Sequence, residues 1–344
     1  MGNYFRRDCG PATAQQNEVD PIHTTARPQA FDVAKMKEAI WFFVSGHGEM
    51  WRAQNGQPTR SLPPKPQCGR WHALSDAGEC SLADNPRVVV VTGAGGTGCG
   101  RAIAARFAAG GAAVVANDIN EAGGQNTVRA IESAGGRAAF YRADVRREPE
   151  ARALVSFAET TFGGLHVLIN NASSPTGGDR LEDWADALET DLLGAIYTTR
   201  WAIESMRRGG GGAVVNIASI SALWHGRKTS GGLPGYDVAK AGMIRMTTRL
   251  ASLAKTDRIR VNCLAPGWIA TDGPRQYWES LTASERAERG VPSRLLTPDQ
   301  VAESVVQLAD DVSLAGRVLV WWSEDAPQLI EWGDRGYRDL VAWS

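Results

Sequence analysis

A tyrosine and a lysine four positions apart, Tyr236 and Lys240, are the residues of this chain best suited to acid–base chemistry. On a helix, positions i and i+4 lie one turn apart on the same face, so a phenol and an ammonium group would be side by side. The ammonium favours the phenolate and lowers the pKa of the tyrosine, which suits the tyrosine to act as a general acid or base. Two surface residues of an amphipathic helix give the same spacing, so the interpretation depends on what precedes the pair.

A glycine-rich segment, residues 92–100, follows the valines at 88–91 and precedes a helical pattern at 101–109. Glycines permit positive φ and let backbone amides approach a pyrophosphate, whose charge the helix N-terminus stabilises. Asp118 ends the next apolar segment, where the acid that binds an adenosine ribose belongs. A carboxylate there accepts hydrogen bonds from ribose hydroxyls and repels a 2′-phosphate, and no arginine follows it directly. The segment therefore predicts a dinucleotide site that prefers NAD to NADP.

Apolar segments of strand length alternate with helical segments from Arg87 onward. Short continuous apolar runs are typical of parallel strands buried on both faces. Their alternation with helices predicts a parallel sheet covered by helices on both sides. The sequence thus predicts the α/β class, with a doubly wound parallel sheet in a single Rossmann-fold domain of residues 86–322. Strands are expected at 88–91, 113–116, 138–143, 167–169, 213–217, 259–264 and 317–320.

The two ends of the chain differ from this domain. Residues 1–85 contain recurrent prolines and little apolar pattern beyond a short amphipathic segment at 31–51. Apolar burial there cannot offset the entropy of ordering, so we expect a largely disordered N-terminal extension. A start codon placed too far upstream would give the same pattern. Residues 323–344 are expected to form a C-terminal extension.

The composition is that of an ordinary soluble protein, with 43% hydrophobic and 22% charged residues. A net charge of −1 argues against a nucleic-acid or membrane-surface partner, and no apolar run approaches the ~18 residues of a membrane span. The polar N-terminal residues argue against secretion. Five scattered cysteines fit the reduced thiols of a cytoplasmic protein. Cys68, His72 and Cys80 match no tight zinc-ligand spacing, so no metal site is expected.

Taken in order, the motifs resemble the short-chain dehydrogenase/reductase family over residues 86–322. Residues 92–100 are similar to the family's TGxxxGxG loop with one extra residue, which is either Gly95 or Gly96. Residues 170–173 resemble its NNAG motif, with serine in place of the glycine. Asp144-Val145 is similar to the adenine-binding pair, and Pro266-Gly267, Ile269 and Thr271 to the nicotinamide-binding turn. The resemblance implies a nicotinamide cofactor held by Gly93, Gly95, Gly98, Gly100, Asp118, Asp144, Val145, Asn171, Tyr236, Lys240, Pro266, Gly267, Ile269 and Thr271.

The family's catalytic residues also have counterparts. Ser219 matches the catalytic serine, and Tyr236 and Lys240 match the YxxxK motif. Asp191 occupies the position of the fourth catalytic residue, which is an asparagine in the family. The resemblance implies an NAD-dependent oxidoreductase of secondary alcohols and ketones, in which the tyrosine exchanges the hydroxyl proton and the serine stabilises charge on the substrate oxygen. The lysine would lower the tyrosine pKa and bind the nicotinamide ribose; Ser221 is a less favoured candidate for the serine.

Departures from the family pattern affect this site. Asp191 could hold a relay water through its backbone carbonyl, or pair with Lys240 and offset the effect of the lysine on Tyr236. Ser219 lies further from the tyrosine in the sequence than is typical, so Trp224 to Pro234 is expected to form an enlarged rim of the substrate pocket. The extra residue of the glycine loop could alter the affinity for pyrophosphate.

The substrate is expected to be a small-molecule alcohol or ketone. Trp224, Trp268 and Trp278 indicate an apolar or aromatic-lined pocket, although each could equally be a buried structural tryptophan. Residues 272–291 are expected to form a mobile helical lid. The resemblance implies a homodimer or homotetramer in which the C-terminal segment meets a neighbouring subunit. Two alternatives stay open: an NADPH-dependent 3-oxoacyl thioester reductase, which Asp118 disfavours, and a non-catalytic dinucleotide-sensing module.

Overall fold

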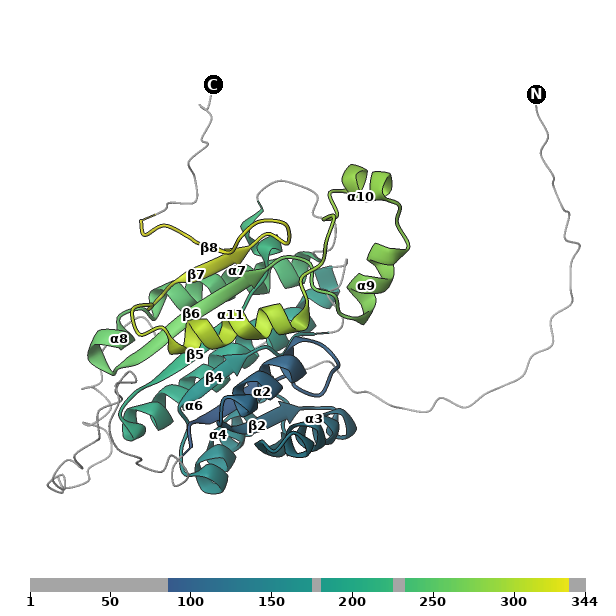
Figure 1. The fold of residues 1–344 in the computed structure, drawn as a ribbon. Helices are drawn as coiled ribbons and strands as arrows, with labels where there is room; N and C mark the ends of the chain where they lie inside the picture. The colour runs from purple at the N-terminus through teal and green to yellow at the C-terminus, as the bar shows by residue number, and fades with distance from the viewer. Residues whose placement is uncertain (1–85, 175–180, 225–232, 334–344) are drawn as a thin grey trace, which may run out of the picture. The chain divides into compact units, whose positions relative to one another are not determined.

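A computed structural model describes residues 86–174, 181–224 and 233–333, which contain an eight-stranded sheet (Figure 1). The predicted extension at 1–85 lies outside the described residues. All strands but the last are parallel, and the last pairs with its neighbour in the antiparallel sense. In sheet order the strands are β3 (Arg137–Arg142), β2 (Ala113–Asp118), β1 (Val88–Thr92), β4 (Val167–Asn170), β5 (Gly212–Ile217), β6 (Ile259–Pro266), β7 (Val318–Trp321) and β8 (Gln328–Leu329).

This topology confirms the predicted α/β class and doubly wound parallel sheet. The strand order reverses between β1 and β4, which is the switch point of a doubly wound fold. Each predicted strand is present within one or two residues of its expected bounds. Every residue of β1 and β4 is buried, because helices cover the sheet on both sides.

One face of the sheet is covered by α2, α3 and α11, and the other by α4, α6 and α7 (Figure 1). Among the described helices, none is both long enough and apolar enough to cross a membrane. The α-helices are α2 (Cys99–Ala109), α3 (Glu121–Ser133), α4 (Glu148–Phe162), α5 (Trp184–Ala187), α6 (Gly194–Gly209), α7 (Pro234–Arg249), α8 (Leu253–Thr256), α9 (Asp272–Glu279), α10 (Ala283–Arg289) and α11 (Pro298–Asp310). Two short 3₁₀ helices, η1 (Leu181–Asp183) and η3 (Ile220–Leu223), and a π-helical turn, η2 (Leu188–Leu193), complete the set.

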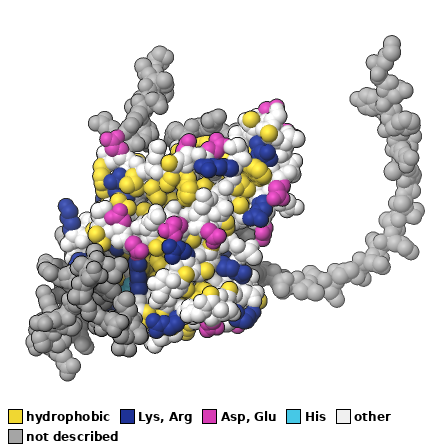
Figure 2. Space-filling view, in the orientation of Figure 1, with side chains coloured by type: hydrophobic (Ala, Val, Ile, Leu, Met, Phe, Trp, Pro, Cys, Tyr) yellow, Lys and Arg dark blue, Asp and Glu magenta, His cyan; other side chains and the backbone are white. Residues whose placement is uncertain are grey.

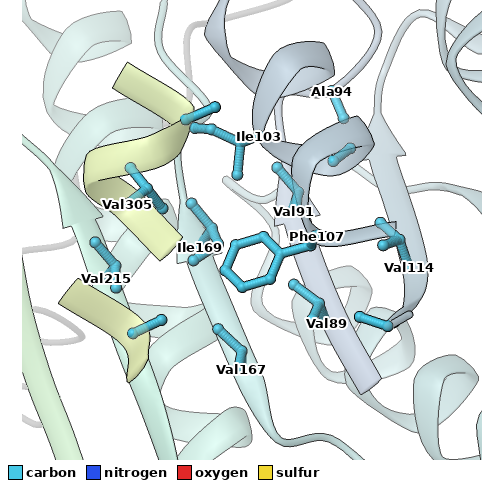
Figure 3. Close-up of a cluster of buried hydrophobic side chains, with 14 of the residues drawn as sticks. Val89, Val91, Ala94, Ile103, Phe107, Val114, Val167, Ile169, Val215 and Val305 are labelled. Atoms are coloured by element: carbon cyan, nitrogen blue, oxygen red, sulfur yellow. The ribbon is translucent and has the colours of Figure 1, made fainter. Parts of the chain in front are cut away.

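The largest apolar core lies between the sheet and helices α2 and α11 (Figure 3). Alternate residues of a strand point to the same face, so Val89 and Val91 of β1 and Ile169 of β4 share this side. They pack with Phe107 of α2 and Val305 of α11. Burial of side chains of this size contributes about 1.5–3 kcal/mol each. The core therefore fixes α2, and with α2 the loop that leads into it.

A buried polar network ties the other helical layer to the sheet. The side-chain NH₂ group of Asn170 donates to the Thr199 hydroxyl and to the side-chain oxygen of Asn216, both at 2.8 Å. The side-chain oxygen of Asn170 accepts from the Thr198 hydroxyl at 2.7 Å. The Asn216 amide donates in turn to Thr247 of α7 at 2.9 Å. Buried amides with paired donors and acceptors stabilise a specific arrangement. The network thus sets α6 and α7 against β4 and β5.

The sequence pattern predicts no strand after Trp322, yet the structure has a short edge strand there, β8. Leu329 of β8 pairs with Leu319 of β7 and remains 38% exposed, and Trp332 is 60% exposed. Figure 2 shows apolar side chains gathered over this edge of the sheet, with charged side chains of both signs spread over the rest of that face. The remainder of the predicted extension, residues 334–344, lies outside the described part of the chain.

Candidate active site

The carboxyl ends of the parallel strands bring the predicted site residues to one edge of the sheet. The glycine loop follows β1, Asp118 ends β2, and Asn170 ends β4. Ser219 follows β5, and Pro266 is the last residue of β6. Since parallel strands all end on the same side, these segments surround the switch point, where doubly wound sheets bind their ligands.

Two glycines of the loop are packed too tightly against neighbouring backbone atoms to carry a side chain. Gly93 has a φ of 67°, and a Cβ there would lie 2.7 Å from the Cα of Ala172. A Cβ at Gly100 would collide with the carbonyl oxygen of Gly93. Helix α2 begins at Cys99, so its N-terminus, which favours bound anions, adjoins the loop. The loop therefore fits the pyrophosphate of a dinucleotide.

Asp118 lies against this loop. Its Oδ2 accepts from the backbone N–H of Gly95 at 2.7 Å, and its Oδ1 accepts from the backbone N–H of Asn120 at 2.8 Å. A Cβ at Gly95 would lie 2.7 Å from the Asp118 Cγ, whereas one at Gly96 would meet nothing closer than 3.9 Å. The close packing requires glycine at Gly95, so the extra residue is accommodated at the exposed tip, Gly96–Thr97.

The tip of the loop contacts the start of α9. The Thr97 hydroxyl donates to Asp272 Oδ2 at 2.9 Å. A Cβ at Gly98 would lie 3.0 Å from the Thr271 Cγ2. Thr271 is the N-cap residue of α9, so this predicted nicotinamide-side residue and the pyrophosphate-side loop are direct neighbours.

The two asparagines after β4 have different surroundings. Asn171 donates from its amide group to the carbonyl oxygens of Thr92 at 2.9 Å and Gly93 at 3.1 Å, and its backbone N–H donates to the Thr92 hydroxyl at 3.0 Å. Asn171 therefore fixes the start of the glycine loop by hydrogen bonds to Thr92 and Gly93. Asn170 belongs instead to the buried network between the sheet and α6.

The predicted adenine-side residues, Asp144 and Val145, follow the end of β3 after one intervening residue. The Asp144 carboxylate pairs with Arg146 at 2.8 Å, and the hydrogen bond from this guanidinium lowers the pKa of the carboxyl below its usual value. Val145 is buried, and its side chain packs so closely on Gly194 that a Cβ at that glycine would lie 2.7 Å from it. An adenine beside Asp144 would thus meet an ion pair rather than a lone carboxylate.

The turn after β6 is held by the last residue of β7 and by the segment that follows it. The Gly267 amide donates to the Trp321 carbonyl at 2.7 Å, and the Trp268 amide donates to the Ser323 hydroxyl at 2.8 Å. A Cβ at Gly267 would lie 2.5 Å from that hydroxyl oxygen. Ile269 forms a β-bridge with Leu296. These contacts fix the turn that leads to Thr271.

Lys240 and Asp191 form an ion pair in the protein interior. Lys240 Nζ lies 2.9 Å from Asp191 Oδ1, and the two side chains are 2% and 0% exposed. Nζ also donates to the Ile217 carbonyl at 2.8 Å and lies 5.3 Å from the centre of the Tyr236 ring. Of the two arrangements considered for Asp191, its side chain adopts the direct pairing with the lysine.

Two departures from the family's motifs contact each other at this ion pair. Ser173, which replaces the glycine of the NNAG motif, donates to Asp191 Oδ1 at 2.6 Å, and the Ser174 amide donates to Oδ2 at 2.9 Å. Asp191 lies in the π-helical turn η2. A buried carboxylate requires several partners, and the serine supplies one that a glycine could not.

The expected lowering of the Tyr236 pKa is not found in the free protein. Burial raises the pKa of Tyr236 above its usual value, and this effect exceeds the lowering by Lys240; Asp191 raises it further, and a hydrogen bond with Ser219 lowers it. Burial alone would lower the pKa of Lys240. The negative charge of Asp191 outweighs this effect, and the pKa of the lysine is raised. The lysine is therefore an ammonium at neutral pH, and the tyrosine carries its proton.

Ser219 is the serine that contacts Tyr236, through the hydrogen bond between their side chains. The Ser219 hydroxyl oxygen accepts from the Ser221 amide at 3.2 Å and lies 3.0 Å from the Ser221 hydroxyl oxygen. Ser221 is hydrogen-bonded to the Asp237 carboxylate. Ser219 thus lies directly beside the tyrosine, while Ser221 is one hydrogen bond further away.

A cavity of about 430 Å³ opens beside the serines. Trp224 and Trp322 stack with ring centres 5.8 Å apart, and Trp268 stacks on Tyr277 at 6.0 Å. Trp322 is not among the tryptophans expected from the sequence to line the pocket. It reaches the cavity because β7, which ends at Trp321, pairs with β6. Residues of its wall are Ile220, Trp224, Trp268, Arg286, Val291 and Trp322.

The predicted lid segment forms two helices, α9 and α10, which project beyond the end of the sheet (Figure 1). Arg286 Nη1 donates to the carbonyl oxygens of Trp278 at 3.0 Å and Leu281 at 2.6 Å. Its guanidinium also lies 4.0 Å from the centre of the Trp278 ring. Trp278 therefore packs within the lid and is absent from the residues that line the cavity, contrary to the expectation from sequence. The mobility of the lid stays a prediction.

The residues considered for zinc, Cys68, His72 and Cys80, lie outside the described residues. Within the described part of the chain, no three His, Cys, Asp or Glu side chains are grouped so as to hold a metal ion. Cys99 and Cys263 are free thiols.

Comparisons with known proteins identify the family of the chain. A family model described as enoyl-(acyl carrier protein) reductase matches residues 93–317. The chain is 36% identical over 233 residues to a cis-4-hydroxycyclohexanecarboxylate dehydrogenase of Sinomonas cyclohexanicum, covering 66% of this chain and 90% of that protein. It is 34% identical over 236 residues to a cyclohexanol dehydrogenase of Acinetobacter sp. (strain SE19), covering 67% and 90%.

Among solved structures, one described as a short-chain dehydrogenase/reductase from Burkholderia xenovorans is 31% identical, with a TM-score of 0.63. The match covers 70% of this chain and 96% of that chain. The family model spans more than half of the sequence, and the curated relatives are matched over nearly their whole length. The chain therefore belongs to the short-chain dehydrogenase/reductase family of oxidoreductases.

Proposed function

We propose that the protein transfers hydride between NAD and a secondary alcohol or ketone that carries an apolar ring, with Tyr236 as the general acid and base. The observation that carries this proposal is the arrangement of Tyr236 between Ser219 and the buried ammonium of Lys240. The cavity adjoins this arrangement, since Ile220 of its wall is the residue after Ser219.

Family membership implies a nicotinamide dinucleotide, which when bound supplies the acceptor or donor of the hydride. The glycine loop would hold its pyrophosphate, and Asp118 its adenosine ribose. Each Asp118 oxygen accepts one backbone N–H and retains capacity for a ribose hydroxyl. The same carboxylate repels a 2′-phosphate, which favours NAD. Asp144 and Val145 would lie along the adenine.

At the other end of the cofactor, Pro266, Gly267, Ile269 and Thr271 would hold the nicotinamide carboxamide. Lys240, held between Asp191 and the Ile217 carbonyl, would bind the nicotinamide ribose and orient it toward Tyr236. Asp191 would act by fixing the position and the charge of the lysine.

Tyr236 would exchange the proton of the substrate hydroxyl, and Ser219 would donate a hydrogen bond to the substrate oxygen and stabilise its developing charge. Since burial raises the Tyr236 pKa, the tyrosine holds its proton at neutral pH and can give it to a ketone oxygen. It must lose that proton before it can accept one from an alcohol. Alcohol oxidation therefore requires a route by which the proton leaves Tyr236.

The walls of the cavity favour a flat apolar ring as the substrate body. Trp224, Trp268 and Trp322 offer large aromatic faces, and aromatic surfaces bind ring-shaped apolar groups over a large contact area. The printed names of two relatives describe dehydrogenases of cyclohexane-ring alcohols. Homo-oligomerisation and a cytoplasmic location are further parts of the proposal.

Replacing Tyr236 with phenylalanine removes the exchangeable proton and retains the ring beside Lys240. We expect NAD-linked turnover to fall by at least about 10²-fold, the contribution typical of a positioned acid or base, while binding of the dinucleotide is retained. Absorbance of the reduced cofactor and its fluorescence on binding measure the two properties. Tyr197→Phe on α6 is the control. Turnover near the wild-type rate in the Tyr236 variant would contradict the assignment.

Wild-type protein is expected to bind NADH more tightly than NADPH. Asp118→Ala should reduce the ratio of the NADPH and NADH dissociation constants by about tenfold, or 1.4 kcal/mol. The reason is that the variant removes the negative charge that repels a 2′-phosphate. Fluorescence titration with each reduced dinucleotide measures both affinities. Glu121→Gln removes a nearby exposed charge on α3 and should leave the preference unchanged. Tighter binding of NADPH by the wild type would instead support the thioester-reductase alternative.

Trp322→Ala should raise the KM for cyclohexanol by about 10-fold or more, since the loss of one apolar wall costs about 1–3 kcal/mol. The KM for propan-2-ol should change much less, because a small alcohol leaves that wall uncovered. Steady-state kinetics with the two alcohols give the comparison. Trp332→Ala, at a site that is 60% exposed, serves as the control. An equal change in the KM for both alcohols in the Trp322 variant would show that the cyclohexanol ring does not bind against Trp322.

Asp191→Ala leaves the Lys240 ammonium buried without its partner, which should lower the free energy of unfolding by about 3–5 kcal/mol. Because the folded-state pKa of Lys240 is raised, the ion pair stabilises fully below the ordinary lysine pKa of ~10.4 and loses its effect as the pH rises through the raised value. Denaturant unfolding at several pH values measures this difference from the wild type. Glu303→Ala breaks the exposed ion pair with Arg106 and should cost about 0–1 kcal/mol; a similar small loss for Asp191→Ala would refute the buried-pair interpretation.

A further inference from the structure

The cavity beside the serines is larger than an alcohol with a single ring requires. Its volume is about 430 Å³, which lies within the range of about 300–1,000 Å³ that buries drug-sized ligands. A water-sized group occupies about 30 Å³, so the cavity has space for roughly fourteen such groups. Cyclohexanol has only about seven groups of this size, so roughly half of the cavity extends beyond it.

The bound dinucleotide would not occupy this space. None of the four residues proposed to hold the nicotinamide carboxamide is among those that line the cavity. The wall starts instead at Ile220, directly after Ser219, and reaches Ala283 and Ala287 on α10. Helix α10 projects beyond the end of the sheet (Figure 1). The space thus extends from the proposed reacting atoms toward the lid.

Contacts within the lid and with the end of the sheet hold the far wall of the cavity in place. Trp268, which follows β6, stacks on Tyr277 of α9 with ring centres 6.0 Å apart. Trp278 of α9 donates from Nε1 to the Pro292 carbonyl oxygen at 2.8 Å, which ties α9 to the segment after α10. The first contact joins the lid to the sheet, and the second joins the two ends of the lid. The size of the cavity therefore follows from how the lid packs.

The far part of the cavity favours an apolar group. Ala283 and Ala287 contribute only methyl side chains to its wall. Among the charged residues of the wall, Arg286 donates to two carbonyl oxygens inside the lid, and the Glu324 carboxylate accepts a backbone N–H from the segment after α10. Asp325 is exposed. A charged group buried against this wall would lose its hydration, a cost that an apolar group does not carry.

We propose that the substrate is a secondary alcohol, or the corresponding ketone, in which a second apolar ring is fused to the ring that bears the oxygen. This inference rests on the proposed function and narrows the substrate class of that same site. The ring with the hydroxyl would lie against Trp322, and the second ring would reach Ala287. In oxidation the hydroxyl proton passes to Tyr236 and the hydride of the same carbon to NAD, so the products are the two-ring ketone and reduced cofactor.

The test compares decahydronaphthalen-2-ol, which has two fused rings, with cyclohexanol in the full-length protein with NAD. The rate of reduced-cofactor formation at limiting alcohol gives kcat/KM for each substrate. The wild-type value should be about 100-fold higher for the two-ring alcohol, because one methylene group in an apolar pocket changes kcat/KM by about 10-fold or more.

Ala287→Phe fills the far part of the cavity. It should lower kcat/KM for the two-ring alcohol by about 10-fold or more, while the value for cyclohexanol stays near that of the wild type. Ala283→Phe is a second variant of the same wall and should act in the same way. Ser284→Phe adds the same ring at an exposed position of α10 that does not line the cavity, and should affect neither alcohol.

Each variant should bind NADH as the wild type does, which shows that it is folded. Equal wild-type values of kcat/KM for the two alcohols would overturn the inference, as would equal losses for both alcohols in the two alanine variants. Turnover of cyclohexanol in those cases would still support the proposed function. Absence of turnover with either alcohol would instead refute the proposed function, and the two-ring substrate with it.

Discussion

The buried ion pair between Lys240 and Asp191 is the interaction on which the rest of the site depends. It fixes an ammonium beside the Tyr236 ring, joins α7 to the π-helical turn η2, and draws the segment after β4 toward both through Ser173. Charges this deeply buried persist only when each has a partner and further hydrogen bonds. The replacement of the family's asparagine by Asp191 and of its glycine by Ser173 therefore form one compensated change rather than two separate ones.

The same pair changes the electrostatic balance around the tyrosine. A lysine alone would favour the phenolate, but burial of the tyrosine outweighs this effect and the Asp191 carboxylate offsets part of the lysine charge, so the pKa of Tyr236 is raised. The protein thus gains a fixed lysine while it loses part of the effect of that lysine on the acid–base group.

Much of the fold could be predicted because buried parallel strands allow little besides β-branched and small apolar residues, as the valines of β1 illustrate. The glycine loop, Asp118, Ser219 and Tyr236 could be located because their chemistry requires a residue type at a fixed place along the chain. The pairing of Asp191 with Lys240 depends on how η2 packs against α7, and this packing cannot be predicted from a local sequence pattern. The same holds for Trp322, whose place in the cavity follows from the pairing of β7 with β6, and for β8, which is too short to give a pattern.

The hydrogen bond between Thr97 and Asp272 joins the tip of the glycine loop to the first residue of α9. Any displacement of α9 must break this bond or carry the tip of the loop with it. The additional residue of the loop thus joins a glycine-rich turn to a helix that is distant in the sequence, and the position of each depends on the other.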